Sequence, residues 1–296
     1  MNKLKVWMNG RSVPMKDARV SVSDRAFLYG DGVFETMRSY AGEVFMLGAH
    51  LDRLFDSLKA VKIRPPFSKK YLASQVERCL KINRLQSAYI RLTVTRGEGK
   101  FGIGICPLLK PNVIIVTKGL DGYPPDLYKR GISVGISKVT RQNEYSPLSG
   151  VKSLNYLNYL SARIDAKARG YDEAVILNTK GCVAECPTSN IFLVKKGRLI
   201  TPSVKSGVLP GITRDVVIGI AKSLRIKVEE RAVRPGELIT SDEVFLTNSI
   251  AEILPVTKIG SRKVGGGLPG EITKLLGISY QKKVIYDTMG LYGKSH

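Results

Sequence analysis

One lysine and one acid in the middle of the chain have the residue types and surroundings for chemistry. Lys152 lies in the short apolar window Val151 to Leu157, at the start of an expected helix, and Glu185 ends the strand pair expected after it. Desolvation by apolar neighbours favours a neutral lysine amine, which can condense with a carbonyl such as that of pyridoxal phosphate (PLP). A carboxylate facing the ring nitrogen of PLP would keep that nitrogen protonated. By spacing alone, a salt-bridged lysine at a helix start explains Lys152 better than a PLP-binding lysine does. Other residues of the chain must decide between these two interpretations.

The scarcity of histidine narrows the chemistry that the chain can carry. Its only histidines are His50 and the C-terminal His296, which argues against a histidine-based triad or a zinc site. Cys182 and Cys186 have the spacing C-x-x-x-C without two further ligands, so small core residues explain them better than a metal site does. We therefore expect no metal. Catalysis has to come from Lys, Glu, Tyr, Arg and a cofactor, which fits PLP.

Length and composition describe an ordinary globular protein. The 296 residues suffice for one large domain or two, and 43% hydrophobic with 24% charged residues is typical of this class. No apolar run reaches about 18 residues, so no membrane partner is expected. The N-terminus lacks the apolar core of a signal peptide, and four cysteines do not make a disulfide framework. We therefore expect a cytoplasmic protein.

The formal net charge of +22 raises nucleic-acid binding as an alternative. However, the lysines are scattered without a basic block, and the only tryptophan is Trp7, so no base-stacking surface is predicted. A basic field can instead attract anionic substrates and a phosphorylated cofactor. We do not expect nucleic acid as the main partner.

Periodicity in the first half predicts strands with two helices between them. Alternation indicates a hairpin over 5–22, a strand over 33–40 and another over 87–96, whereas apolar spacing indicates helices over 50–61 and 70–82. The segment GEGKFG that follows matches G-x-G-x-x-G, but the prolines beyond it prevent the helix that a dinucleotide site requires. We expect a flexible loop at a site entrance.

A Gly- and Pro-rich linker over 120–127 separates a small domain over 1–119 from a larger one over 128–296. The second half predicts a strand over 131–139, an antiparallel meander over EAVILN, CVAE, NIFLV and RLITP, and a final helix over 271–288. Between that strand and the meander, a helix from about Ser153 should turn its leucines inward, namely Leu154, Leu157 and Leu160, together with Ile164.

Two turns of the second half have donors for an anion. Gly211, Ile212 and Thr213 in LPGITR begin a helix, where free backbone N–H groups favour phosphate, although capping by Thr213 explains the pattern equally well. A second turn at Asn248 and Ser249 follows a strand and offers hydroxyl and N–H donors.

With these motifs in order, the chain resembles the fold-type IV PLP enzymes, the class-IV aminotransferase family. The resemblance runs from about Trp7 to Ile259 and rests on DRAFLYGDGVFETMR, HLDRL, YIRLTVTRG, KSLNYL, ECPTSNIF, LPGITR and TNSIAEILPV. The family holds branched-chain aminotransferases, D-amino acid aminotransferases and 4-amino-4-deoxychorismate lyases. It implies an α/β (α+β) fold with a smaller N-terminal α/β domain, a larger C-terminal pseudo-barrel and PLP between them. It also implies a homodimer or higher oligomer.

The resemblance implies a role for each cofactor-binding residue. Lys152 would bind the cofactor covalently and then serve as general base and acid, Glu185 would hold the pyridine nitrogen, and Tyr156 would hydrogen-bond the phenolic oxygen. The remaining cofactor contacts would be Arg53, Ile212, Thr213 and Ser249 for the phosphate and Leu209 for the ring face.

The resemblance also implies a substrate pocket. Tyr89-x-Arg91 is typical of the branched-chain enzymes, Thr36 resembles a threonine of the lyases, and Arg96 resembles a carboxylate-binding arginine of the D-amino acid enzymes. TNSIAE departs from the usual T-G-T-A-A-E-like turn, and Cys186 stands where Gly is commoner. The full set implied for the substrate is Tyr29, Phe34, Thr36, Arg38, Tyr89, Arg91, Arg96 and Ile250, although packing under a loop explains Tyr29 and Phe34 nearly as well.

We therefore expect an aminotransferase that moves an amino group from an amino acid to a 2-oxo acid such as 2-oxoglutarate. Branched-chain amino acids are favoured as donors. The lyase and D-amino acid activities are the alternatives.

Overall fold

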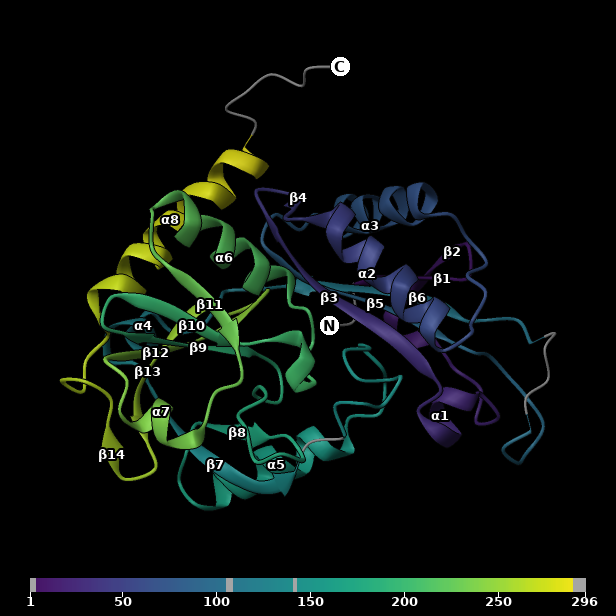
Figure 1. Ribbon diagram of the computed structural model, residues 1–296. Helices are drawn as coiled ribbons and strands as arrows, with labels where there is room; N and C mark the ends of the chain where they lie inside the picture. Colours follow the sequence, from purple (N-terminus) through teal and green to yellow (C-terminus); the bar gives the residue numbers. More distant parts are fainter. Residues whose placement is uncertain (1–3, 105–108, 141–142, 290–296) are drawn as a thin grey trace. The chain divides into compact units, whose positions relative to one another are not determined.

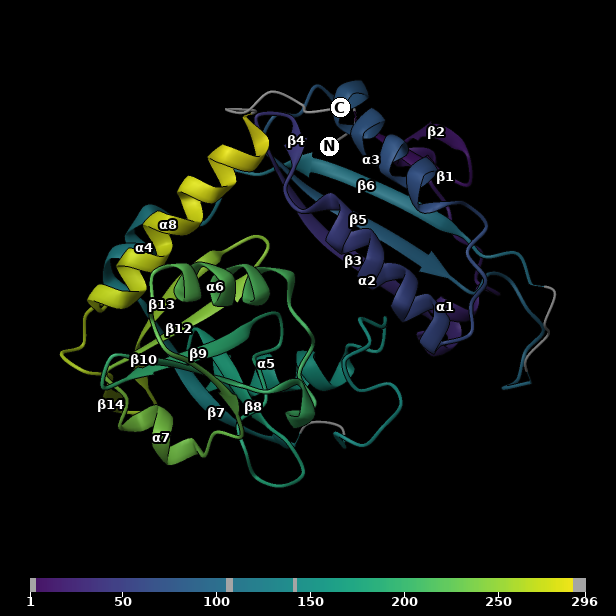
Figure 2. The same cartoon turned by 45° about the horizontal axis from the view of Figure 1, so that its top comes forward.

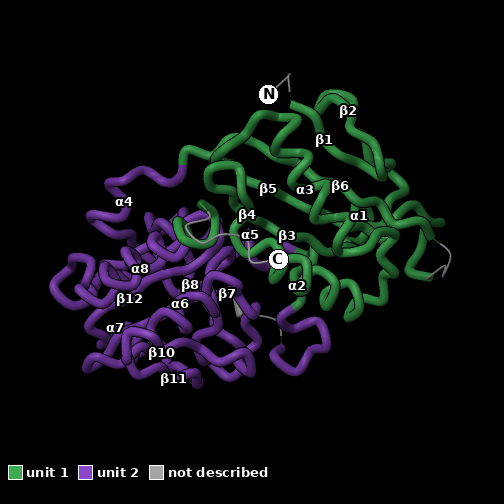
Figure 3. Tube along the Cα trace, turned by 90° about the horizontal axis from the view of Figure 1, so that it is seen from above, with its two compact units in different colours: residues 1–121, 151–155, 284–296 green, residues 122–150, 156–283 purple. Residues whose placement is uncertain are grey.

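The computed structural model describes residues 4–104, 109–140 and 143–289 (Figure 1). The chain forms two compact units (Figure 3). Unit 1 comprises Met1–Asp121, Val151–Asn155 and the segment from Val284, and unit 2 comprises Gly122–Gly150 and Tyr156–Lys283. The division after Asp121 falls inside the expected linker. The segment Val151–Asn155 lies within the range 128–296 expected for the larger domain and is part of unit 1, where Ser153 forms a bridge with Val33 of one of its strands.

Unit 1 is built on an antiparallel sheet of six strands in the order β2-β1-β6-β5-β3-β4. Pairing of the two central strands puts Thr36 opposite Arg91 and Arg38 opposite Tyr89. The strands are β1 (Lys5–Met8), β2 (Arg11–Pro14), β3 (Gly32–Tyr40), β4 (Glu43–Val44), β5 (Ala88–Thr95) and β6 (Val113–Gly119).

Two long helices, α2 (Leu47–Ala60) and α3 (Lys69–Asn83), lie over one face of this sheet (Figure 2). The expected helix over 70–82 is α3, and Ser68 caps it by accepting a hydrogen bond from Tyr71 N at 3.2 Å. Because side chains alternate along a strand, Val33, Glu35 and Met37 of β3 are buried on the face under the helices, among the core residues Trp7, Leu54, Leu58 and Ile90. The short helices of unit 1 are η1 (Met15–Asp17) and α1 (Arg25–Tyr29).

Unit 2 contains a mixed sheet of eight strands. The order is β11-β10-β9-β12-β13-β7-β8, with β14 paired to β13, and the pairs β10–β11, β13–β7 and β7–β8 are parallel. The strands are β7 (Ile132–Thr140), β8 (Glu173–Leu177), β9 (Asn190–Lys195), β10 (Arg198–Pro202), β11 (Val228–Arg231), β12 (Glu243–Asn248), β13 (Glu252–Ile259) and β14 (Arg262–Lys263). Together with unit 1, this confirms the expected α/β class.

Six helical segments accompany this sheet in the part of the chain that the structure describes. They are α4 (Pro125–Arg130), α5 (Leu157–Ala168), η2 (Val204–Ser206), α6 (Ile212–Ser223), α7 (Pro235–Ile239) and α8 (Glu271–Thr288). The bounds of α8 match the expected helix over 271–288. CVAE, expected as a strand, forms only isolated bridges such as that between Leu177 and Val183.

The orientation expected for the helix after Lys152 was wrong. Helix α5 begins at Leu157, and Leu157, Leu160 and Ile164 are 81%, 50% and 69% exposed. The face that packs against β7 and β8 carries Ala162 and Ala166, whose small side chains allow close approach to the sheet. The apolar repeat predicts a helix correctly but cannot say which side turns inward, since alanines follow the same period.

Within the described residues, none of the helices combines the length and the apolar character needed to cross a membrane.

Candidate cofactor and substrate site

In unit 1, Lys152 lies in an extended segment paired with β3, ahead of α5. Phe34 N donates to Lys152 O at 3.0 Å, and Leu154 N donates to Gly32 O at 3.0 Å. These bonds fix the backbone on both sides of Ser153. They also bring Lys152 Nζ to 4.8 Å from the centroid of the Phe34 ring. The lysine is therefore held by a strand and not by a helix start.

The face of β3 opposite the helices carries several of the expected substrate residues. Phe34, Thr36 and Arg38 alternate along β3 and point to this face, and the pairing of β3 with β5 adds Tyr89 and Arg91. The Arg91 guanidinium lies 3.7 Å from the centroid of the Phe34 ring, as a cation–π pair. Phe34 thus contacts both a guanidinium and the amine of Lys152.

The helix-side face of β3 carries a buried ionic cluster that includes Arg53. Glu35 is fully buried, and Arg53 donates from Nε to Oε1 at 2.7 Å and from Nη2 to Oε2 at 2.8 Å. His50, one helical turn before Arg53 on α2, places Nδ1 at 2.8 Å from Glu35 Oε2. Glu35 and His50 were not predicted from the sequence. An acid at a buried position of a strand, with His and Arg spaced i, i+3 on the following helix, is the signal that could have identified them.

Electrostatics within this cluster favour an ionised carboxylate and a neutral imidazole. Burial raises the pKa of Glu35, but hydrogen bonds from His50 and Arg53 outweigh that effect and hold the pKa at about 2. Burial lowers the pKa of His50 below its ordinary value, against the opposing pull of Glu35. His50 is therefore neutral near pH 7, donates from Nδ1, and helps Glu35 to orient the Arg53 guanidinium.

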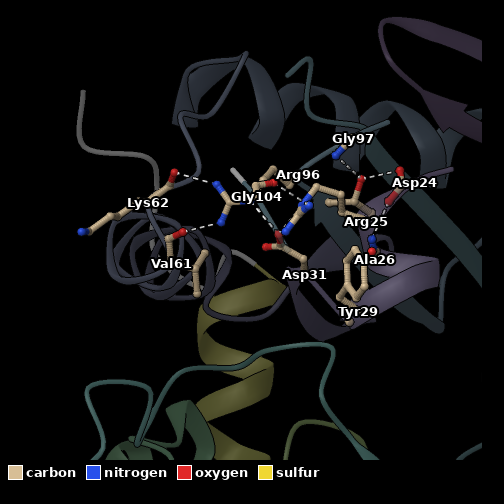
Figure 4. A network of polar contacts seen from close by, with 12 residues as sticks. Asp24, Arg25, Ala26, Tyr29, Asp31, Val61, Lys62, Arg96, Gly97 and Gly104 are labelled. Carbon is tan, nitrogen blue, oxygen red and sulfur yellow. Dashed lines mark hydrogen bonds and ion pairs between the residues drawn. The ribbon is translucent and has the colours of Figure 1, made fainter. Parts of the chain in front are cut away.

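Tyr29 and Arg96 belong to a second polar cluster of unit 1 (Figure 4). Arg96 donates to Asp31 Oδ2 at 2.7 Å, to Val61 O at 2.7 Å and to Lys62 O at 3.0 Å, which fastens the end of β5 to the end of α2. Burial raises the pKa of Asp31, but hydrogen bonds from Arg96 and Arg25 have the larger, opposite effect. The pKa therefore lies below its ordinary value, and the carboxyl is ionised. These contacts give Arg96 a structural role. They do not support the carboxylate-binding role that the resemblance implies for it.

The same cluster holds the glycine-rich loop after β5. Arg25 donates to the carbonyls of Gly102 and Gly104 at 3.2 Å each, and Tyr29 Oη accepts from Gly102 N at 2.8 Å. The Arg25 guanidinium also lies 5.0 Å from the centroid of the Tyr29 ring. Tyr29 is thus engaged with the loop expected at a site entrance.

In unit 2, Glu185 is 3% exposed and its carboxylate is fixed by hydrogen bonds. Tyr159 donates its hydroxyl to Oε1 at 2.9 Å, Leu209 donates its backbone N–H to Oε2 at 2.8 Å, and Asn190 Nδ2 lies 3.4 Å from Oε2. Tyr156 lies just before α5, and its ring centroid is 4.9 Å from that of Tyr159. Tyr159 was not predicted from the sequence, although the tyrosine pair in NYLNYL follows a helical spacing.

Both turns expected to hold an anion also belong to unit 2. Helix α6 begins at Ile212 after Gly211, and Thr213 is buried. A Cβ at Gly211 would overlap with Asn190 Oδ1, so a larger residue here would displace the Asn190 side chain. Ser249 and Ile250 lie in the turn that joins β12 to β13.

Each of the two units carries groups that suit part of PLP. In unit 2, Glu185 is a buried carboxylate that accepts hydrogen bonds from a phenol, an amide side chain and a backbone N–H, and such an environment suits a protonated ring nitrogen. The start of α6, also in unit 2, offers backbone N–H groups that suit a phosphate. In unit 1, Lys152 carries an amine that can condense with an aldehyde.

Comparison with known proteins agrees with this chemistry. A family model for amino-transferase class IV matches residues 32–259. The chain therefore belongs to the class IV amino-transferases and is a PLP-dependent aminotransferase.

Two relatives and one solved structure each match more than 90% of this chain. A protein of Methanocaldococcus jannaschii, provisionally named a branched-chain-amino-acid aminotransferase, is 45% identical over 92% of this chain and 94% of its own length. An aminodeoxychorismate lyase of Bacillus subtilis is 34% identical over 94% of each chain. The crystal structure of a branched-chain amino acid aminotransferase of Escherichia coli superposes with a TM-score of 0.93, at 32% identity over 98% of each chain.

Proposed function

We propose that this aminotransferase takes its amino group from a branched-chain amino acid and passes it to a 2-oxo acid such as 2-oxoglutarate. The observation that carries the proposal is the arrangement at Phe34, whose ring lies beside both Lys152 Nζ and the Arg91 guanidinium. An apolar ring next to the amine suits an aliphatic side chain. A guanidinium on the same ring suits the additional carboxylate of a dicarboxylic oxo acid.

In the proposed mechanism, bound PLP supplies an electron sink that makes the α-proton of the amino acid acidic. Lys152 Nζ would accept that proton as a base and later donate a proton as an acid. Glu185 would accept a hydrogen bond from the protonated ring nitrogen. The phosphate would be held by Arg53, Ile212, Thr213 and Ser249, and the ring would be contacted by Tyr156 and Leu209.

The amine of Lys152 is tested by Lys152→Ala. We expect loss of leucine-dependent glutamate formation by more than about a thousandfold, because the variant lacks the group that moves the proton. Purified wild-type protein should have the visible absorbance of lysine-bound PLP, bleached by borohydride, and the variant should not. A loss of activity below tenfold would contradict the assignment.

The carboxylate of Glu185 is tested by Glu185→Gln, which keeps the shape but removes the charge. We expect retained PLP and a kcat reduced by at least about tenfold, since proton transfer needs the charged ring. Tyr159→Phe removes one hydrogen bond to Glu185 and should have a smaller effect of the same kind. Wild-type kinetics in Glu185→Gln would refute the pyridinium role.

Thr36 is the observation that favours the lyase as the second candidate. It lies on the same face of β3 as Phe34, opposite Arg91 in the pairing with β5. Release of pyruvate from aminodeoxychorismate in the absence of any amino acceptor would identify the lyase. D-alanine, assayed with 2-oxoglutarate, tests the D-amino acid alternative.

We further propose a homodimer joined through α5. The exposed side of this helix carries Leu157, Leu160, Ser161, Ile164 and Ala168, an uncharged stripe with helical spacing. Because the chain carries a net charge of +22, a surface free of charge lets a second copy approach with less electrostatic repulsion. A stripe that contacts itself around a twofold axis meets that condition.

The proposed location is the cytoplasm. Cys79, Cys182 and Cys186 are free thiols, which is consistent with a reducing compartment.

A further inference from the structure

A single side chain, that of Asn248, organises the turn between β12 and β13. Its Oδ1 accepts hydrogen bonds from Ile250 N at 2.8 Å and from Ala251 N at 2.7 Å. Its Nδ2 donates to Ser189 Oγ at 2.8 Å. The first two bonds close the turn around Ser249, and the third ties that turn to another segment.

Ser189 belongs to the turn that follows Glu185. Cys186 N donates to Ser189 O at 2.8 Å, and the next residue, Asn190, begins β9 and directs Nδ2 towards Glu185 Oε2. In the sheet, Asn190 pairs with Thr247, so Ser189 and Asn248 are neighbours across two strands. The path from Asn248 to the Glu185 carboxylate therefore consists of short hydrogen-bonded turns.

The far side of the Ser249 turn is also held. Glu252 is 6% exposed, has a φ of 60° and accepts a hydrogen bond from Gln281 on α8. A left-handed conformation at a residue other than glycine persists only where surrounding contacts maintain it. The turn between Asn248 and Glu252 is thus fixed at both ends.

We propose that Asn248 is a positioning residue that sets the phosphate turn at Ser249 relative to the Glu185 carboxylate. This inference rests on the proposed function, which assigns Ser249 to the phosphate and Glu185 to the ring nitrogen. In PLP a short CH2–O arm joins the phosphate to the ring that carries the nitrogen, so the distance between the phosphate and the nitrogen can vary only within narrow limits. The two protein groups that bind them must therefore keep a matching separation.

The test compares PLP binding by apo-protein for wild type, Asn248→Ala and Asn248→Gly. We expect a dissociation constant raised about tenfold in both variants, because the turn loses hydrogen bonds that hold it in place. The phosphorus NMR signal of bound PLP should broaden or shift. Ser189→Ala removes only the bridge to Ser189, leaves the turn closed and should weaken binding about threefold.

Asn83→Ala is the matched control. Asn83 also makes three side-chain hydrogen bonds, two to Lys5 and one to Thr117, but it belongs to unit 1 and is not assigned to the cofactor. Its loss should lower the melting temperature and leave PLP affinity unchanged.

Two outcomes separate this inference from the proposed function. Wild-type affinity with an unchanged phosphorus signal in Asn248→Ala and Ser189→Ala would overturn the role of Asn248 alone. Failure of the wild-type protein to bind PLP at Lys152 would overturn the site on which the inference rests.

Discussion

At the scale of single residues, the buried carboxylate of Glu35 orients the guanidinium of Arg53. Glu35 is buried beside the apolar core of unit 1 and accepts two parallel hydrogen bonds from the Arg53 guanidinium. This geometry leaves the guanidinium little rotational freedom. A cation oriented before a phosphate arrives costs less entropy on binding than one that must first be ordered.

The lowered pKa of Glu35 makes the stability of the fold sensitive to acid. A carboxyl with a pKa near 2 in the folded state and 4.5 ordinarily stabilises the fold above pH 4.5, and this contribution is lost as the pH falls towards 2. At about 1.4 kcal/mol per pKa unit, the contribution is about 3 kcal/mol. His50, whose pKa is lowered by burial, adds a loss that begins as the pH falls below 6.5, since only the unfolded chain takes up that proton.

Urea unfolding of wild type and Glu35→Gln, measured from about pH 7 to about pH 3, tests this linkage. The variant should lose about 3 kcal/mol at pH 7 and should decline less steeply between about pH 4.5 and pH 3. Asp52→Asn is the control, because the Asp52–Lys69 pair is exposed at 64% and 47%. Equal slopes below about pH 4.5 in wild type and Glu35→Gln would disprove the role of Glu35 in acid sensitivity.

At the scale of elements, α5 has two apolar sides with different tasks. Its alanine side packs on β7 and β8, and it directs Tyr159 to Glu185. The opposite side, from Leu157 to Ala168, is the exposed stripe of the proposed dimer. The position of α5 is therefore coupled to the orientation of Glu185, the residue proposed to contact the cofactor, because Tyr159 of the same helix donates to its carboxylate.

Ile164→Glu tests the dimer surface. Two carboxylates brought together across a twofold axis repel each other, so the variant should sediment as a monomer while its circular dichroism stays that of wild type. Ile278→Glu on α8, a residue 57% exposed, is the control and should leave the oligomer intact. Dissociation of the Ile278→Glu variant alone would place the interface on α8 and exclude α5.

At the scale of the whole molecule, the net charge of +22 comes from lysines and arginines that are spread along the chain and not gathered in one basic block. A positive field attracts a dianionic oxo acid more strongly than a zwitterionic amino acid, and salt screens that attraction. The same field causes dimers of the chain to repel one another, which favours solubility.

Raising the ionic strength from about 0.02 M to about 0.3 M should therefore lower kcat/KM for 2-oxoglutarate roughly threefold. The value for leucine should change much less, because the zwitterion has no net charge. Half-reactions measured separately for the two substrates give both numbers. An equal salt effect on the two substrates would rule out steering by net charge.

The sequence by itself determined the family, the α/β class and the elements whose signals are local. Helix α3 has its serine cap next to it, and α8 begins directly after Pro269 and Gly270 and contains no proline, so local signals suffice to locate both. Lys152 and Glu185 were predicted from short windows of the chain, and Arg53 was predicted from the family resemblance.

Only the tertiary structure decided which residues hold those motifs in place. Glu35 meets Arg53 across 18 residues, Tyr159 meets Glu185 across 26 and Asn248 meets Ser189 across 59. Such contacts depend on strand pairing and helix packing, which no periodicity within a single segment encodes. The inward side of α5 was decided in the same way, because leucines and alanines share the helical period and only packing against β7 and β8 selects between them.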